Sequence, residues 1–229
     1  KRQRYNRKSE FLYEKAETTA LLANILTGAA YPKAELHDGW ETILLNQFHD
    51  IIPGSSIKEV YEVSKSQYEA LLQAGNRMVK NAGAEVIGKV ATDGGVLVFN
   101  PNSFEASGTV QLNGETVFVR DIPAKGYKIV KDYEARGEVQ ATEKVLENAF
   151  FRIELDETGA FTRLYDKRND REVLKAGARG NVLTAYEDYP RDYDNWEISN
   201  YYKEKSWELS DKAEIYPVTD GARAGVEIR

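Results

Sequence analysis

Residues 92–101 read Thr-Asp-Gly-Gly-Val-Leu-Val-Phe-Asn-Pro, and the hydrophobic pattern of the chain changes at this stretch. Upstream of it, apolar residues recur every three or four positions, which is the spacing of one helix face. Downstream, short alternating apolar runs are separated by glycine, asparagine, aspartate and proline, as in strands joined by turns. The change predicts an α+β chain with a helical domain over residues 1–91 and a β domain over residues 92–229.

Three amphipathic helices are predicted in the upstream domain. The first is expected over residues 7–26 and the second over residues 36–50, where Pro53-Gly54 follows. The third begins at Ser56, because Glu59 three positions later completes a capping-box pattern. The expected core stripe of the second helix consists of Trp40, Ile43, Leu44, Gln47 and Phe48. Short connections between the helices predict a three-helix bundle.

Two hairpins stand out in the downstream domain. Residues 109–112 and 116–119 flank Asn113-Gly114, which is a strong signal for a two-residue hairpin turn. Residues 151–155 and 161–164 flank a second turn rich in aspartate and glycine. Many short strands at this spacing predict an antiparallel β-sandwich-like domain.

The composition excludes several classes of function. Of 229 residues, 31 are Lys or Arg and 37 are Asp or Glu, so the net charge of −6 argues against a nucleic-acid partner. The absence of cysteine excludes disulfides, thiolate metal ligands and a cysteine nucleophile. No apolar run approaches the roughly 20 residues that span a bilayer. No signal peptide is visible either, so we expect a cytoplasmic protein with no membrane partner.

Both ends of the chain resemble the interior of a longer sequence. There is no initiator methionine, and residues 226–229 read like the middle of a strand. We therefore expect a fragment whose β domain is truncated.

The chain has only two histidines, His37 and His49. On the predicted second helix, His49 falls about 180° from Trp40, on the face that also carries Leu45, so we expect its imidazole to point away from Trp40, Leu44 and Phe48 and to be at least partly exposed in this chain. His49 is either a last-turn histidine favoured by the helix dipole or a metal ligand, and no nearby residue completes a His-Glu-x-x-His pattern. Asp50 is either a polar residue of a helix-ending turn or a carboxylate that contacts a cation or a sugar.

The stretch Leu-Leu-Asn-Gln-Phe-His-Asp-Ile-Ile-Pro-Gly-Ser-Ser over residues 44–56 resembles the middle-domain signature of family 38 α-mannosidases. Phe48, where some members have a second histidine, and the Pro-Gly-Ser-Ser turn make the chain more similar to the bacterial-type branch. Further segments resemble the family's β region in the expected order: residues 98–101, 146–148, 159–167, 181–183 and 194–196.

The resemblance implies a zinc-dependent retaining α-mannosidase that hydrolyses terminal α-mannosides of glycans. In that family a histidine of the helical domain completes the Zn²⁺ site of a neighbouring N-terminal α/β barrel, which makes His49 the expected metal ligand. Asp50 matches the aspartate that contacts the bound mannose. The nucleophile and the other zinc ligands belong to the barrel, so no catalytic residue is assigned here and the fragment is expected to be inactive.

The segment from Tyr186 to Tyr202 holds six aromatic rings among several acidic residues. Such rings form either a sugar-binding surface or strand residues buried against a sheet. The alternative to an enzyme fragment is therefore a non-catalytic carbohydrate-binding or interaction module. A purely structural linker domain, with this segment buried, is the third hypothesis.

Overall fold

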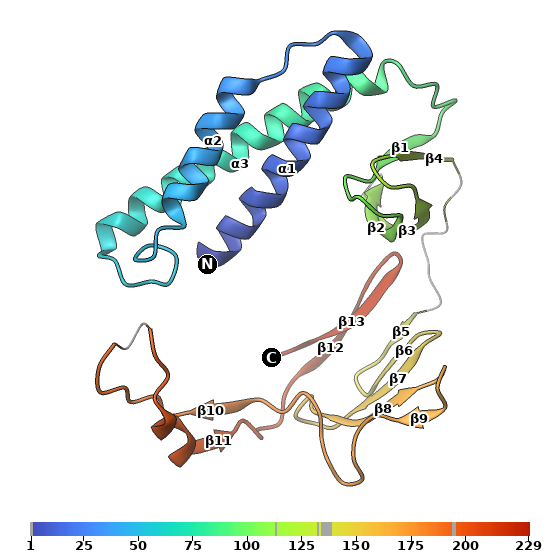
Figure 1. The fold of residues 1–229 in the computed structure, drawn as a ribbon. Helices are drawn as coiled ribbons and strands as arrows, with labels where there is room; N and C mark the ends of the chain where they lie inside the picture. Colours follow the sequence, from blue (N-terminus) through green and yellow to red (C-terminus); the bar gives the residue numbers. More distant parts are fainter. Residues whose placement is uncertain (1, 113, 132, 134–138, 194–195) are drawn as a thin grey trace. The chain divides into compact units, whose positions relative to one another are not determined.

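The computed structural model describes residues 2–112, 114–131, 133, 139–193 and 196–229 (Figure 1). The chain divides into two compact units, Lys1–Leu97 and Val98–Arg229, whereas the change in sequence pattern was placed between residues 91 and 92. Three helices are followed by several small antiparallel sheets, which confirms the predicted α+β class.

The helical unit consists of α1 (Arg2–Thr27), α2 (Lys33–Asn46) and α3 (Lys58–Ile87). The chain runs along α1, returns along α2 and runs forward again along α3 (Figure 1). The buried core between the helices is formed by Tyr13, Ala16, Leu36, Ile43, Tyr68, Leu71 and Met78. The close approach of α2 to α1 requires Gly39, because a Cβ atom there would lie 2.0 Å from Cε1 of Tyr13.

The buried face of α2 differs in part from the predicted stripe. Ile43 is fully buried, and Trp40 donates a hydrogen bond from Nε1 to Glu17 on α1, at 2.8 Å. Leu44 and Phe48, however, are 61% and 51% exposed, so their assignment to the core was wrong. Leu44 follows Ile43 by about 100° around the helix and so falls outside the face that α1 and α3 cover, while Phe48 lies beyond the end of α2.

The start of α3 also differs from the prediction. The helix begins at Lys58 after Ile57, without a side-chain hydrogen bond at its N-terminus. The predicted capping box of Ser56 and Glu59 is therefore wrong, because the Ser56 hydroxyl donates instead to the backbone carbonyl of Asp50 at 2.6 Å.

The β unit begins with β1 (Val96–Phe99), which pairs with β4 (Tyr127–Val130). Next along the chain, β2 (Ala106–Leu112) and β3 (Glu115–Ile122) form the first predicted hairpin, in which Val110 lies opposite Val117. Gly114 has a φ of +87°, as the predicted turn requires, while Asn113 lies outside the described residues.

The largest sheet is a five-stranded antiparallel meander in chain order. Its strands are β5 (Gln140–Ala141), β6 (Val145–Glu147), β7 (Phe151–Leu155), β8 (Phe161–Asp166) and β9 (Arg171–Glu172). The second predicted hairpin is confirmed by the pairing of β7 with β8. Its turn is organised by Asp156, whose Oδ1 accepts hydrogen bonds from Thr158 and from the Ala160 amide.

Two further hairpin-like pairs complete the described part of the β unit. They are β10 (Thr184–Tyr186) with β11 (Ser206–Glu208), and β12 (Ile215–Asp220) with β13 (Arg223–Ile228). The short 3₁₀ helix η1 (Asn200–Glu204) is the one helical element in the described residues from 98 onward. Thr116 joins β3 to the last pair, because its hydroxyl donates to Asp220 at 2.6 Å and its carbonyl accepts from the Ala222 amide.

None of the helices in the described ranges has the length and apolar character needed to cross a membrane.

Candidate functional site

His49 and Asp50 lie in the turn that follows α2. The helix ends at Asn46, with Gln47 at its C-cap, so the turn starts before either residue is reached. The backbone then folds back on itself, because the amides of Ile51 and Ile52 both donate to the carbonyl of Phe48. The helical-wheel direction predicted for His49 therefore does not apply.

The His49 side chain is 69% exposed, which confirms its expected accessibility in this chain. Its predicted direction away from Phe48 is wrong, because the two ring centroids are 4.1 Å apart with an interplanar angle of 42°. The imidazole also approaches the next residue, with 3.4 Å between His49 Nε2 and Asp50 Oδ2. The structure thus brings together the two residues that the sequence singled out.

Asp50 is anchored through its backbone and half exposed through its carboxylate. Its carbonyl oxygen accepts hydrogen bonds from the hydroxyls of Ser56 (2.6 Å), Tyr61 (3.3 Å) and Ser55 (3.4 Å). The Ser55 hydroxyl also lies 3.3 Å from Oδ1 of Asp50. Sequence reasoning missed Tyr61, because a tyrosine eleven positions after Asp50 in the chain belongs to no local motif.

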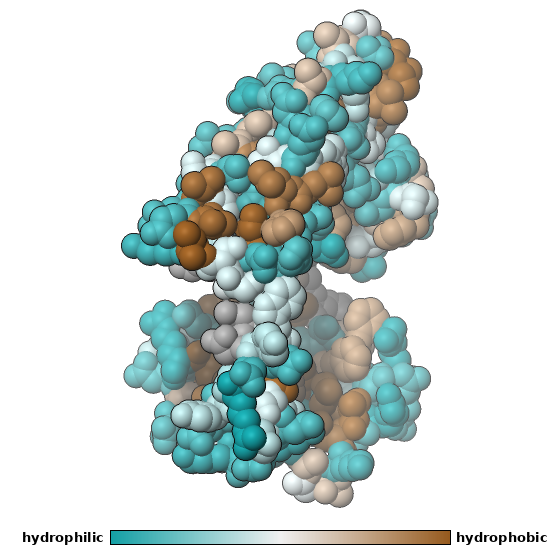
Figure 2. Space-filling model, turned by 60° about the vertical axis from the view of Figure 1, so that its left-hand side comes forward, coloured by the Kyte–Doolittle hydropathy of each residue, from teal (hydrophilic) through white to brown (hydrophobic). Residues whose placement is uncertain are grey.

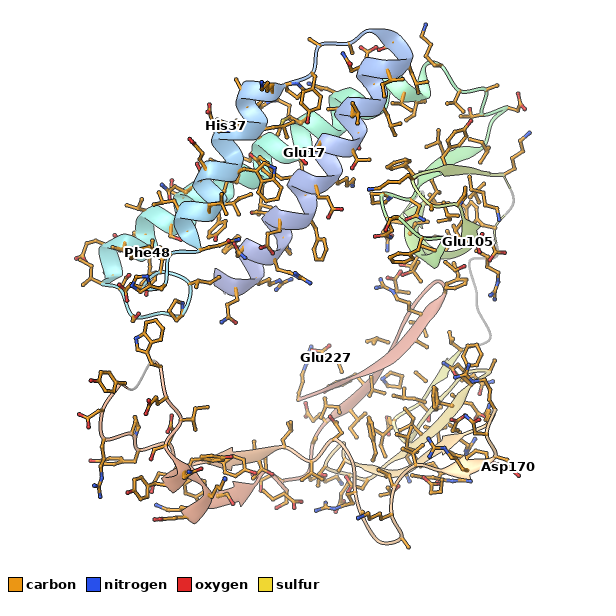
Figure 3. All side chains as sticks on the ribbon, in the orientation of Figure 1. Glu17, His37, Phe48, Glu105, Asp170 and Glu227 are labelled. Atoms are coloured by element: carbon orange, nitrogen blue, oxygen red, sulfur yellow. The ribbon has the colours of Figure 1, made fainter. Side chains whose placement is uncertain are left out.

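Exposed apolar side chains flank this turn. Leu45 is 57% exposed, and Phe48 lies at the end of the helical unit where α2 gives way to the turn (Figure 3). Hydrophobic side chains gather in patches on the surface of this unit (Figure 2). Burial of such a patch against another protein surface is favourable, whereas its exposure to water is not.

The second histidine is remote from the turn. His37 lies near the start of α2, and its Nε2 is 3.2 Å from Glu41 Oε1, one helical turn further on. Within the described residues, no three His, Cys, Asp or Glu side chains are grouped so as to hold a metal ion. An exposed imidazole nitrogen is a good zinc donor, so His49 fits one position of a zinc site whose other ligands come from elsewhere.

The aromatic segment between β10 and β11 is exposed. Tyr189 is 79% exposed and Tyr193 is 71% exposed, so the interpretation as buried core is wrong for this chain. Tyr186, Trp196 and Tyr201 are also exposed. A hollow of about 600 Å³ is lined by Glu187, Tyr189, Arg191, Tyr201, Glu204 and Lys205. Rings, carboxylates and cations around one hollow are the groups that bind sugar hydroxyls and sugar faces.

The charged residues of the five-stranded sheet are engaged with one another. Glu147 accepts from both Lys167 (2.7 Å) and Arg152 (2.6 Å), and Arg152 also contacts Glu154. The hydrogen bond from Lys167 is the main cause of a lowered pKa for Glu147. Glu147 is therefore a carboxylate held in its charged form by two cations, which is typical of a structural ion pair.

The helical unit has an exposed His-Asp turn after α2, and several small antiparallel sheets follow it in the chain. Comparison with known proteins identifies the class of protein that has this arrangement. The alpha mannosidase middle domain matches residues 1–86, and the glycosyl hydrolases family 38 C-terminal domain matches residues 146–229. The chain belongs to glycosyl hydrolase family 38.

Curated relatives agree with this assignment. The chain is 27% identical over 215 residues to alpha-mannosidase 2C1 of Homo sapiens, an alignment that covers 87% of the chain and 21% of the relative. It is 23% identical to alpha-mannosidase G of Dictyostelium discoideum, covering 72% of the chain and 21% of the relative. The chain thus spans about a fifth of the length of these relatives.

Solved structures share the fold. A family 38 glycosyl hydrolase from Enterococcus faecalis matches with a TM-score of 0.75 and 16% identity, covering 99% of this chain and 36% of the other. An alpha-mannosidase from Enterococcus faecalis V583 matches with a TM-score of 0.71 and 14% identity, covering 95% and 33%.

Proposed function

We propose that this chain is part of a zinc-dependent retaining α-mannosidase that hydrolyses terminal α-mannosides of glycans. The observation that carries the proposal is the exposed pair His49 and Asp50, 3.4 Å apart on a turn of a domain that matches the α-mannosidase middle domain. The relatives with that domain are named alpha-mannosidases. A cytoplasmic location stays a prediction.

In this proposal His49 supplies one zinc ligand and Asp50 contacts the mannose. A carboxylate binds sugar hydroxyls by charge-assisted hydrogen bonds, and the 48% exposure of Asp50 leaves it accessible to them. Bound zinc would polarise and position the hydroxyls of the sugar. The partner is an N-terminal α/β barrel of the same polypeptide, which would cover Leu45 and Phe48 and supply the remaining ligands and the nucleophile.

The experiment measures zinc content and hydrolysis of an aryl α-mannoside by the full-length protein and two variants. His49→Ala should lower both, because a zinc site loses one of its three or four ligands. Asp50→Asn should keep most of the zinc and lose activity, because only the charge of the sugar contact is removed. Wild-type rate and zinc content in both variants would contradict the proposal.

The 229-residue chain by itself should bind zinc weakly and leave the same substrate intact. One imidazole cannot form a zinc site, and retention of configuration needs two carboxyl groups that flank the scissile bond. Hydrolysis by the purified chain at a rate near that of the full-length protein would show that the nucleophile lies within these residues.

A second candidate function is carbohydrate binding by the segment between β10 and β11, favoured by the exposure of Tyr189 and Tyr201 around the hollow. Calorimetric titration of the 229-residue chain with mannobiose tests it. Tyr189→Ala should abolish the heat of binding, whereas Phe104→Ala, which removes an exposed ring elsewhere in the β unit, should not. No heat with the unaltered chain would exclude the module hypothesis for this sugar.

A further inference from the structure

The backbone carbonyl of Asp50 is the convergence point of the turn. Its oxygen accepts hydrogen bonds from the hydroxyl groups of Ser56, at 2.6 Å, and of Tyr61, at 3.3 Å. Ser55 lies slightly further away, at 3.4 Å. A carbonyl oxygen has two lone pairs, so the two closer donors alone can satisfy it. The geometry therefore fixes this peptide group from the side of α3.

Tyr61 and Ser56 also contact each other. The Ser56 amide donates to the Tyr61 hydroxyl at 2.6 Å, so the tyrosine oxygen accepts from one end of the loop while it donates to the other. Tyr61 lies on the first turns of α3, a 30-residue helix that packs against α1. The turn is thus attached to the most extensive element of the helical unit.

These bonds are not explained by helix capping. The hydroxyl oxygen of a serine before a helix ordinarily accepts a hydrogen bond from an amide of the first turn, and α3 has no such bond. The Ser56 hydroxyl instead faces backwards to residue 50. Within the described residues 47–57, backbone amides donate to the carbonyl of Phe48 and none donates to that of Asp50, so the side-chain hydroxyls satisfy the Asp50 carbonyl instead.

We propose that Ser56 and Tyr61 are positioning residues that hold Asp50, and with it His49, in the orientation that the reaction requires. The proposal rests on the function proposed above. Both side chains project from this turn, so hydrogen bonds that order its backbone limit the directions in which the imidazole and the carboxylate can point. A displacement of about 1 Å in such a group lowers catalysis by up to about a hundredfold.

The test uses the full-length protein, with kcat/KM on an aryl α-mannoside, zinc content and Tm as readouts. Ser56→Ala should lower kcat/KM about tenfold, the value of one lost hydrogen bond, and Tyr61→Phe, which loses two, should lower it at least as much, both at wild-type zinc content. Ser56→Thr keeps the hydroxyl and should retain wild-type kcat/KM. The double variant should lose less than the product of the two single losses, because both hydroxyls act on one carbonyl.

Tyr68→Phe is the matched control. It removes a tyrosine hydroxyl from the same helix, where it donates to Asn6 at 3.1 Å in the core, and should lower Tm without changing kcat/KM. An equal loss of kcat/KM in Tyr68→Phe would reduce the effect to general destabilisation and overturn the proposal. Wild-type kcat/KM in Ser56→Ala and Tyr61→Phe, with His49→Ala and Asp50→Asn impaired, would also overturn it while leaving the function intact. Wild-type activity in His49→Ala and Asp50→Asn would contradict both the positioning role and the proposed function.

Discussion

The two units of the chain are stabilised in different ways. The helical unit buries large side chains between its helices, and Tyr13 and Tyr68 are almost inaccessible to solvent. The five-stranded sheet of the β unit is held at its turns and on its surface, by Asp156 at the β7–β8 turn and by ion pairs such as that between Arg152 and Glu147.

The two units therefore tolerate different substitutions. A packed interface between helices is sensitive to added volume, whereas a turn is sensitive to the loss of a polar partner. The candidate site combines the two, since an exposed turn is fixed by hydroxyls from a packed helix. Residues 49 and 50 can therefore be accessible and oriented at the same time.

The largest effect is expected for Gly39→Ala in the helical unit. The added Cβ would lie 2.0 Å from the Tyr13 ring, so the helices must separate, and we expect destabilisation of about 2–3 kcal/mol. Urea unfolding followed by helical circular dichroism measures it. Gly83→Ala, where a Cβ atom meets nothing within 4 Å, is the control and should stabilise the unit by up to about 1 kcal/mol. Equal midpoints for the two variants would show that the helices are not closely packed at Gly39.

A smaller effect is expected for Asp156→Ala in the β unit. The variant loses the hydrogen bonds that Oδ1 accepts from Thr158 and Ala160, which should destabilise the β7–β8 hairpin by about 1–2 kcal/mol. Hydrogen exchange of the amides in β7 and β8 reports this free energy of opening. Glu157→Ala, at the next position of the same turn, leaves these bonds in place and should exchange as the unaltered chain does. Unchanged protection in Asp156→Ala would mean that the turn does not stabilise the sheet.

The smallest effect is a difference between the two units in how their stability depends on pH. Burial, and secondarily the Glu10 carboxylate, raises the pKa of Tyr68 to about 12. An unfolded tyrosine ionises near pH 10.0, so this contribution to stability is complete below pH 10.0 and is lost as the pH rises towards about 12. The Tyr68→Phe variant should show a shallower fall in its unfolding midpoint over this range. An identical slope in both proteins would contradict the assignment.

The stability of the β unit should instead change at acidic pH. Hydrogen bonds from Thr158 are the main cause of a lowered pKa for Asp156, whose ordinary value is 3.8. The sign is therefore opposite: the contribution is present above about pH 4 and is lost as the pH falls through the lowered pKa. Hydrogen exchange of β7 and β8 at decreasing pH, corrected for intrinsic rates, should show this loss in the unaltered chain and not in Asp156→Ala. Equal losses in both would place the acid sensitivity elsewhere.

The helices and hairpins were predictable because their signals are local. The alternation around β7 and β8 and the Gly114 turn are both short-range signals, and the structure confirms both pairings. The exposure of Leu44 was not predictable, because neighbouring apolar positions on one helix give no information about which of them another helix covers.

The site was predictable in its residues and not in its geometry. His49 and Asp50 were identified through the resemblance of residues 44–56, but their direction was derived for a helix that ends at Asn46. Helix ends are the least determined feature of a periodic pattern. The role of Ser56 was missed for a related reason, since serine followed by glutamate three positions later fits a cap equally well.

Anomalous diffraction at the zinc absorption edge, from crystals of the full-length protein, tests whether His49 binds zinc. We predict an anomalous peak about 2.0–2.1 Å from an imidazole nitrogen of His49, with the remaining ligands from residues outside this chain. A zinc ion coordinated entirely by other residues, with His49 outside its coordination sphere, would contradict the account.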